Sequence, residues 1–423
     1  MPFFVNLFFS SILLILIIKG INITTAMILM AVVFFSFNYS FKTRFFMIII
    51  LLLVFLRTIS IISIPENIEV GILGKIIDKN DNFYVVKTDK VYINEQWEKL
   101  NEKIYFSYNK FSTDKYEIGN KIYIVGIKNN DNFNIEYMAN SAKESIYSFR
   151  GVIKDRLYNN FPYENKNIIF SVVFGGLRGK DAEIFKNSGL LHLFAVSGFH
   201  VYLIYSILYI LYSKTLIPIN FRRVLTIIFL LIYLSATGFS DSAVRASFVL
   251  ILIEFNKIFG LNIDSKNILG LVGVINLLYN PIVVFSVGFL MSYSAALSIL
   301  ILIEKTKNSF LIAISAFLAI LPWSIIFFNG FSVLGVFLSI AFVPIIYSLI
   351  FFSFIYTIIP LPEIINIIVN NYIEIIKYIL KYINHYIMYI NLDGDLVFVF
   401  YVISVIVLFL FHIIFKLKYK EEY

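Results

Sequence analysis

The chain has 423 residues, of which 59% are hydrophobic and 15% are charged, with a formal net charge of +8 and no cysteine. Soluble domains are about one quarter charged, so this composition excludes an ordinary soluble globular protein. The lack of cysteine excludes disulfides, thiolate metal sites and cysteine nucleophiles.

Long apolar runs predict a polytopic α-helical membrane protein. They occur at 3–18, 21–37, 45–63, 224–238, 309–328, 333–352 and 396–415. The first run lacks the charged start and small-residue cleavage site of a signal peptide, so we interpret it as a retained anchor. Lys42 and Arg44 outweigh Lys19, which places the loop 38–44 in the cytoplasm and sends the chain outward at Pro65.

Residues 66–142 alternate with a period of two, which predicts β-strands. The five runs are IEVGILGKIID, FYVVKTDKVYI, KIYFSYN, GNKIYIVGIK and FNIEYMA. Five short strands in about 75 residues suit a small barrel of the OB type, inserted as an all-β extracytoplasmic domain. Tyr84, Tyr92, Tyr105 and Tyr123 are candidates for stacking on DNA bases; the alternative is that they fill the barrel core.

The charge is unevenly distributed. From Ile64 to Arg150 there are 12 basic and 13 acidic residues, whereas the rest of the chain has 23 basic and 14 acidic ones. Basic residues near the ends of membrane segments follow the positive-inside rule. Attraction of a polyanion is the other reading, although the near-neutral strand region predicts no strongly basic groove.

The segment after the strands predicts an amphipathic helix near 145–160, with Lys154 and Arg156 at a membrane surface. The glycine-rich loop that follows lacks the spacing of a phosphate-binding P-loop. Later apolar runs are interrupted by Pro322, Pro344 and several glycines, which predicts broken helices around protein or a water-filled cavity. Residues 363–390 carry a polar stripe, which predicts a helix that lies at the interface or lines something wet.

Two of the four histidines lie in the apolar stretch GLLHLFAVSGFH. At about 100° per helical residue, His192, Ser197 and His200 share one face. Three readings remain open. The first is a hydrolase built on Ser197 and His200, and the second is a zinc site, for which a third ligand is missing. The third is the wall of a pore or a packing element. A second cluster, TGFSDSAVRAS, places Asp241 and Arg245 four apart, either as an ion pair or with Arg245 offered to phosphates. GFLMSYSAALS spaces Gly288 and Ser292 as a packing face.

These motifs, in this order, resemble the ComEC family, whose members are membrane channels for DNA uptake in natural competence. The resemblance rests on SGLLHLFAVSGFHV, TGFSDSAVRAS, NPIVVFSVGFLMSYSAA and LPWSIIFFNGFSVLGVFLSIAFVP, and covers about residues 1–360. The matching positions are Gly189, His192, Ser197, Gly198, His200, Thr237, Gly238, Ser242, Arg245, Gly288, Ser292, Pro322 and Pro344. Leu290, Ser339 and Asp241 depart from residues that are common in the family.

The resemblance implies a channel, not an enzyme, that passes single-stranded DNA across the bacterial inner membrane. Its path residues would be His192, Ser197, His200, Thr237, Ser242, Arg245 and Ser292, and its helix breaks or packing sites Gly189, Gly198, Gly238, Gly288, Pro322 and Pro344. No catalytic residue, metal or cofactor is expected. Many relatives carry a metallo-β-lactamase-like nuclease domain, and no H-x-H-x-D-H cluster is found here, so a short form is expected.

The predicted division is 1–63 (membrane helices), 64–142 (OB-like domain), 143–187 (amphipathic or interfacial helices), 188–360 (channel core) and 361–423 (amphipathic helix and final membrane helix). The expected partners are single-stranded DNA, lipid, a DNA receptor, a separate nuclease, and a cytoplasmic motor or single-strand-binding protein. The C-terminus is expected in the cytoplasm. Two alternatives remain, a membrane serine hydrolase and a small-solute transporter with broken helices. The sequence leaves open whether 267–303 crosses the membrane once or twice.

Overall fold

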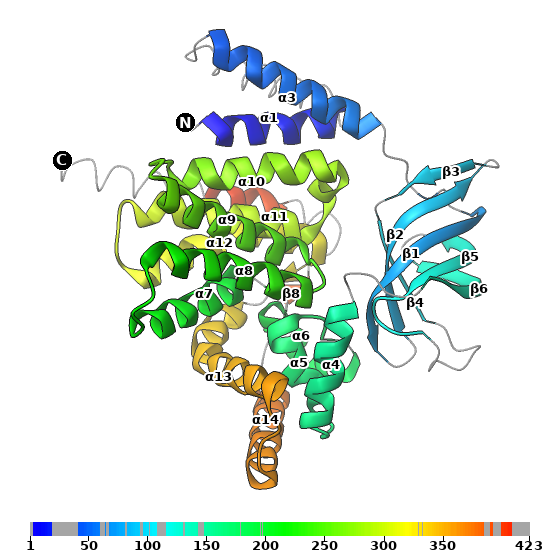
Figure 1. The fold of residues 1–423 in the computed structure, drawn as a ribbon, viewed down its shortest axis with the longest axis vertical. Helices are drawn as coiled ribbons and strands as arrows, with labels where there is room; N and C mark the ends of the chain where they lie inside the picture. Colours follow the sequence, from blue (N-terminus) through cyan, green and yellow to red (C-terminus); the bar gives the residue numbers. More distant parts are fainter. Residues whose placement is uncertain are drawn as a thin grey trace.

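A computed structural model describes residues 3–18, 41–59, 64, 67–80, 83–93, 96–100, 102–107, 116–129, 132–142, 148–177, 179–194, 196, 198–328, 330–331, 333–384, 390–391 and 399–407. The predicted segment at 21–37, Ser197 and the chain beyond residue 407 lie outside the described residues. Within the described ranges, the chain is mainly helical, with a small antiparallel sheet between helices α3 (Phe41–Ile59) and α4 (Ser148–Asn160) (Figure 1).

The helices are α1 (Phe3–Ile18), α3 (Phe41–Ile59), α4 (Ser148–Asn160), α5 (Lys166–Phe174), α6 (Gly179–Asn187), α7 (Gly198–Ser213), α8 (Ile219–Ala236), α9 (Asp241–Phe259), α10 (Ser265–Tyr279), α11 (Val287–Ile303), α12 (Ser309–Phe328), α13 (Val333–Ile358) and α14 (Glu363–Asn384). Two 3₁₀ turns, η3 (Leu191–Phe194) and η4 (Pro281–Phe285), precede α7 and α11. The segment 267–303 therefore forms two helices.

The helices from α7 to α12 form one bundle, in which each packs against the next along the chain. In Figure 1, α8, α9 and α10 run side by side, α1 and α3 lie along one flank, and the sheet stands beyond one end of the bundle. Two of the described helices are long and apolar enough to cross a membrane, at Ile219–Ala236 in α8 and Phe310–Phe327 in α12. Shorter apolar stretches of 10–17 residues lie in α1, α3, α7, α10, α11 and α13.

Helices α12 and α13 continue through their prolines. Pro322 lies inside α12 and Pro344 inside α13. The prediction that these two residues break their helices is therefore wrong. A proline removes one backbone donor, but the long apolar stretches on either side keep each helix continuous. The interruption falls between them, where β7 (Gly330–Phe331) pairs with β8 (Ile390–Asn391).

Close packing of α1 on α10 depends on two glycines that the sequence analysis did not single out. A Cβ added at Gly270 would lie 2.5 Å from the carbonyl carbon of Phe4, and one at Gly273 would lie 2.4 Å from the ring of Phe8. By contrast, a Cβ at Gly288 would meet nothing within 4 Å. The predicted packing role of Gly288 is therefore wrong, because its α-carbon faces open space.

We expect Gly270→Ala to destabilise the protein by about 1–3 kcal/mol, because the new methyl group must push the backbone of α1 away. Gly288→Ala is the matched control, and alanine there should be neutral or slightly stabilising, since alanine favours helices over glycine. Thermal unfolding of both variants in the same detergent checks this. Equal melting temperatures for the two variants would contradict the packing seen at Gly270.

The sheet contains β1 (Glu69–Asn80), β2 (Phe83–Ile93), β3 (Gln96–Lys99), β4 (Lys103–Ser107), β5 (Lys121–Asn129) and β6 (Asn132–Ala142). Each of the five predicted runs contains a strand, and β3 is the one the sequence missed, because four residues give too short an alternation. The order is β3-β2-β1-β5-β6, with β4 also paired to β2 and lying against β6. Inward residues such as Ile72, Ile76, Ile122 and Ile124 are fully buried.

Helix α14 has the polar stripe that the sequence predicts; within it Asn366 is buried and Lys377 is half-buried, whereas Glu374 is exposed. Its residues bond to the start of α5 and to α6: Asn165 Nδ2 donates to Glu374 Oε1 at 2.8 Å, and Lys377 Nζ lies 3.4 Å from Asp181 Oδ1. Hydrogen bonds from Lys377 and Asn165 lower the pKa of the Glu374 carboxyl. The stripe thus holds α14 to the fold, while isoleucines on another face, such as Ile364 and Ile368, stay exposed.

Candidate functional site

Arg245 lies where three helices of the bundle meet. It is one turn into α9 and is only 7% exposed. Its Nη1 donates to the backbone carbonyl of Ser292 on α11, and its Cζ lies 5.6 Å from the centre of the Tyr293 ring. At the start of α7, a Cβ on Gly198 would lie 2.9 Å from Arg245 Nη2. The glycine therefore makes room for the guanidinium.

Asp241 is not the partner of Arg245. It lies 3.6 Å from Lys103 Nζ on β4 and accepts a hydrogen bond of 3.4 Å from Ser286 Oγ. The predicted ion pair on α9 is wrong, because the first residue of the helix faces the sheet while Arg245 faces the bundle interior. Among the described residues, no carboxylate oxygen lies within 4.0 Å of Arg245.

An unpaired buried cation is costly, by several kcal/mol after relaxation and water penetration. Ionisable groups among apolar helices are therefore candidates for a functional site. Arg245 can present donors in a planar fork, which suits the oxygens of a phosphate or carboxylate. Arg245 is therefore a candidate for contact with an anion.

The other predicted path residues differ in their surroundings. Ser242 Oγ donates to the carbonyl of Val196, close to Arg245 along α9, and Ser292 supplies the carbonyl that Arg245 contacts. Thr237 is buried and its hydroxyl donates to the carbonyl of Leu234 at 2.8 Å, so it caps α8; its place on a path stays a prediction. His200 is 2% exposed in α7. The side chains of His192 and Ser197 lie outside the described residues, so the predicted serine–histidine pairing stays a prediction.

Two glycines end helices as the motif predicts. Gly189 has φ +73° and follows α6, where Leu190 N donates to the carbonyl of Phe185 at 2.7 Å. Gly238 has φ +68° and follows α8. Left-handed backbone costs glycine little, and it satisfies carbonyls at a helix end. Both turns bring the next segment back onto the bundle.

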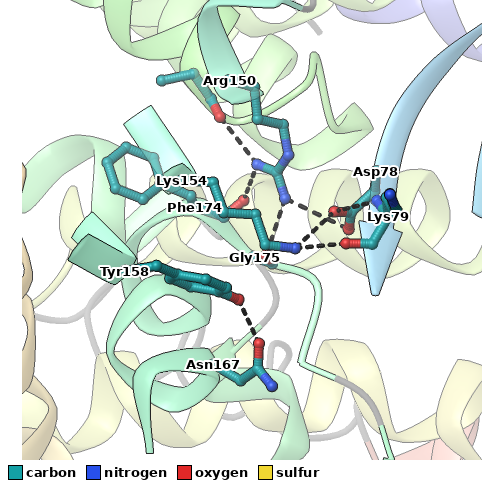
Figure 2. Close-up of polar contacts among 9 residues, drawn as sticks. Asp78, Lys79, Arg150, Lys154, Tyr158, Asn167, Phe174 and Gly175 are labelled. Atoms are coloured by element: carbon teal, nitrogen blue, oxygen red, sulfur yellow. Dashed lines mark hydrogen bonds and ion pairs between the residues drawn. The ribbon is translucent and has the colours of Figure 1, made fainter. Parts of the chain in front are cut away.

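Arg150 on α4 joins the sheet to the helices (Figure 2). It is 3% exposed, and its Nη1 donates to the carbonyls of Phe174 at 2.7 Å and Ala236 at 2.9 Å. Its Nη2 donates to the carbonyl of Gly175 at 3.1 Å and lies 3.5 Å from Asp78 Oδ2 on β1. One guanidinium therefore satisfies carbonyls at the ends of α5 and α8, where cations are favoured.

Lys154 strengthens this junction from the next turn of α4. Its Nζ donates to the carbonyl of Lys79 at 2.5 Å and lies 3.9 Å from Asp78 Oδ1 (Figure 2). The prediction that Lys154 lies at a membrane surface is wrong, because it is buried against the sheet. Arg156 is at the outer side of α4 and donates to the carbonyl of Ile358 at 2.8 Å. The sequence analysis missed Arg150 and Asp78, since they come from different segments.

A second buried charge cluster lies at the other ends of α7, α8 and α9. Glu254 is 3% exposed, and its carboxylate accepts from Tyr205 Oη at 2.6 Å and Lys257 Nζ at 2.8 Å. Arg223 Nε of α8 lies 3.7 Å from the same carboxylate. Side chains from three helices thus contact the Glu254 carboxylate, so Glu254 holds these helices together. Arg245, by contrast, has no carboxylate within 4.0 Å among the described residues.

The four tyrosines predicted to stack on DNA bases do not all lie on the same face of the sheet. Tyr84 is fully buried and stacks on Phe106 with ring centres 5.6 Å apart, so the prediction that it contacts bases is wrong. Its register directs it into the buried core of the strand region. Tyr92 and Tyr105 are 40% and 44% exposed, and Tyr123 is half-buried on the outer face.

The fold and the site define a helical protein with a docked antiparallel sheet and a buried arginine site among apolar helices. The competence protein family model matches residues 175–414, which is more than half of the chain, and the chain belongs to this family. It is also 24% identical over 221 residues to ComE operon protein 3 of Bacillus subtilis (strain 168). That match covers 50% of this chain and 28% of the relative's length. No solved structure matches the chain.

Proposed function

We propose that the protein is a polytopic channel of the bacterial inner membrane that passes single-stranded DNA into the cytoplasm during natural competence. The observation that carries the proposal is the buried guanidinium of Arg245, which has no carboxylate within 4.0 Å among the described side chains. Phosphates passing along α9 would supply the missing negative charge. Conduction also requires binding that can release, and a single arginine suits weak holding.

The charge distribution supports an orientation. Lysines and arginines gather where α7, α9 and α11 end and where α8, α10 and α12 begin: Lys214, Arg222, Arg223, Lys257, Lys266, Lys305 and Lys307. The turns at the opposite end, 236–241 and 279–287, contain no basic residue. By the positive-inside rule, the basic end is cytoplasmic.

The sheet contacts the end without basic residues. Lys103 of β4 lies 3.6 Å from Asp241, and Lys87 of β2 lies 5.6 Å from the ring centre of Tyr279. Arg57, near the end of α3, donates to the carbonyl of Tyr279 at 3.2 Å. These contacts support an extracytoplasmic sheet, in agreement with the orientation that Lys42 and Arg44 predict.

The strand order supports an OB-like barrel. If β3 is set aside, the strands follow one another as β1-β2-β4-β6-β5 and return to β1. Counted along the chain without β3, this is 1-2-3-5-4, a five-stranded Greek-key arrangement of the kind that commonly binds oligonucleotides. The domain would receive DNA outside the membrane and pass it to the helices.

The proposal makes the chain a channel and not an enzyme. A hydrolase built on Ser197 and His200 needs a carboxylate to orient the histidine, and among the described carboxylates Asp181 is engaged with Lys377 and Asp241 with Lys103. A small-solute transporter has no evident use for a docked extracytoplasmic sheet. The receptor, the nuclease and the motor or single-strand-binding protein would be separate partners.

The test is DNA import in cells that lack this gene. Labelled DNA should remain at the surface or in the periplasm and should fail to reach a nuclease-resistant cytoplasmic pool, and transformation should be lost. Normal import in these cells would overturn the proposal. In that case Ser197→Ala, assayed for loss of any hydrolase activity, becomes the informative variant.

A further inference from the structure

Four lysines stand directly opposite one another across four strands of the sheet. Lys103 on β4 pairs with Lys87 on β2, Lys87 pairs with Lys75 on β1, and Lys75 pairs with Lys121 on β5. Residues directly opposite in neighbouring strands project from the same face of a sheet, with their Cβ atoms about 5 Å apart. The four ammonium groups therefore form a ladder along the outer face, which we call the lysine ladder.

Like charges directly opposite destabilise a sheet, and acids compensate this ladder only in part. Lys75 lies 3.1 Å from Asp89, and Lys103 lies 3.6 Å from Asp241. For Lys87 and Lys121, no carboxylate oxygen lies within 4.0 Å among the side chains that the structure describes. A second pair, Lys90 and Lys99, is also directly opposite and exposed. Such a row is suited to a polyanion.

Four aromatic rings lie in a row on the same face. Their centres are 5.2 Å apart for Tyr92 and Trp97, 6.1 Å for Trp97 and Tyr123, and 6.5 Å for Tyr123 and Tyr137. Three of them are well exposed: Tyr92 at 40%, Trp97 at 43% and Tyr137 at 54%. The row crosses β1 at Gly71, where a Cβ would lie 2.7 Å from Tyr123 Oη.

The aromatic row and the lysine ladder run side by side. On β5, Tyr123 is two residues from Lys121, and on β1 Gly71 is four residues from Lys75, without a register shift between β1 and β5. Residues separated by an even number of positions along a strand project from the same face of the sheet. Tyr105, which is 44% exposed, lies two residues from Lys103 on β4. The aromatic row and the lysine ladder therefore lie next to each other on one face of the sheet.

The ladder leads to the helical bundle. Its β4 end contacts Asp241, which is four residues before Arg245 on α9, and Lys87 lies over the ring of Tyr279 at the end of α10. Trp97 lies within the aromatic row, and its ring neighbours Tyr92 and Tyr123 are both on strands. A chain bound on this face would run toward the arginine site.

We propose that this outer face binds single-stranded nucleic acid, with bases stacked on Tyr92, Trp97, Tyr123 and Tyr137 and phosphates held by the lysine ladder. Stacking platforms beside a positive groove are the usual means of holding single strands without sequence preference. The inference rests on the proposed function and adds the residues and the direction of entry. Aromatic rings also settle at membrane surfaces, but Lys103 and Lys87 contact protein here, which favours the nucleic acid.

The test uses the full-length protein in nanodiscs and a labelled oligothymidine of about 20 nucleotides, longer than one OB-type site. The variant Lys75→Gln, Lys87→Gln, Lys103→Gln, Lys121→Gln should lower the slope of log K against log salt by about 2.8, since each phosphate contact contributes about 0.7 for single strands. The matched control removes the same number of positive charges at the other end of the bundle: Lys214→Gln, Lys266→Gln, Lys305→Gln, Lys307→Gln. An equal slope in variant and control would overturn the proposal.

A second measurement uses Trp97 as a probe. The protein has two tryptophans, so Trp323→Phe leaves Trp97 as the only tryptophan, and oligothymidine should quench its selectively excited fluorescence. The pair Trp97→Ala and Tyr137→Ala should weaken binding about tenfold or more with the salt slope unchanged. No quenching by oligothymidine, with a blue shift of Trp97 on anionic vesicles instead, would show a membrane-seated face and overturn the proposal. These readouts do not require import. A protein that binds oligothymidine but does not import DNA would support this inference and contradict the proposed function. Import without binding would support the proposed function and contradict this inference.

Discussion

Arg245→Ala is expected to reduce import of labelled DNA about 10- to 100-fold while the protein remains folded. A hydrogen bond to a charged group contributes about 1.5–3 kcal/mol, and each 1.4 kcal/mol is tenfold in an equilibrium. The substitution also removes a buried cation that has no carboxylate partner among the described residues, so the cost to folding should be small. Import in cells and thermal unfolding of the purified variant measure the two effects separately.

Two further substitutions sharpen this prediction. Arg245→Met keeps the length of the side chain without charge, and its melting temperature should equal or exceed that of the parent although import falls. Arg245→Lys keeps the charge but loses the planar fork, so import should be intermediate. The control is Lys307→Ala, an exposed cation in the turn before α12. Loss of stability in Arg245→Met, in proportion to loss of import, would point to a structural role and contradict the phosphate contact.

Arg150→Ala is expected to destabilise the protein by about 3–5 kcal/mol, the usual effect of breaking a buried ion pair from one side. It leaves the carbonyls of Phe174, Gly175 and Ala236 without this donor, and Asp78 with Lys154 as its remaining cationic partner among the described residues. The sheet should separate from the helices before the bundle unfolds. Thermal unfolding and limited proteolysis of the segment between the sheet and α4 measure this.

The controls come from the same helix and the same cluster. Arg156→Ala removes one bond from an exposed arginine to the carbonyl of Ile358, and should change stability by less than about 0.5 kcal/mol. Adding Asp78→Asn to Arg150→Ala should restore part of the loss, because the remaining acid no longer carries a buried charge. Equal melting temperatures for Arg150→Ala and Arg156→Ala would show that the junction does not depend on Arg150.

Local patterns predicted the strands and the helix ends well. Alternating residues such as Ile122, Tyr123 and Ile124 fix a strand with one buried face, and Gly189 and Gly238 end helices in the conformation that glycine favours. The sequence also singled out Arg245, which is 7% exposed; its contact with phosphates stays a prediction. These features depend on neighbours within a few residues along the chain.

The contacts that the sequence missed join residues far apart in the chain. Asp78 and Arg150 are separated by 72 positions, and Trp97 and Tyr123 meet only because Gly71 lets a ring cross β1. The total charge of the strand region is near zero, yet its lysines gather on one face, which a count along the sequence cannot reveal. The helix alone allows Asp241 to pair with Arg245 or to face the sheet. Contact with the sheet decides between these two orientations, so Asp241 does not pair with Arg245.

The most direct measurement is photo-crosslinking from Tyr293, whose ring lies over Arg245. Azidophenylalanine at this position is close to the natural side chain in shape and should crosslink to labelled DNA during import in living cells. The matched control carries it at Phe255, a 40% exposed position on α9. DNA attached to position 293 and not to position 255 is the result that a path beside Arg245 predicts. Normal import with no DNA attached at position 293 would contradict it.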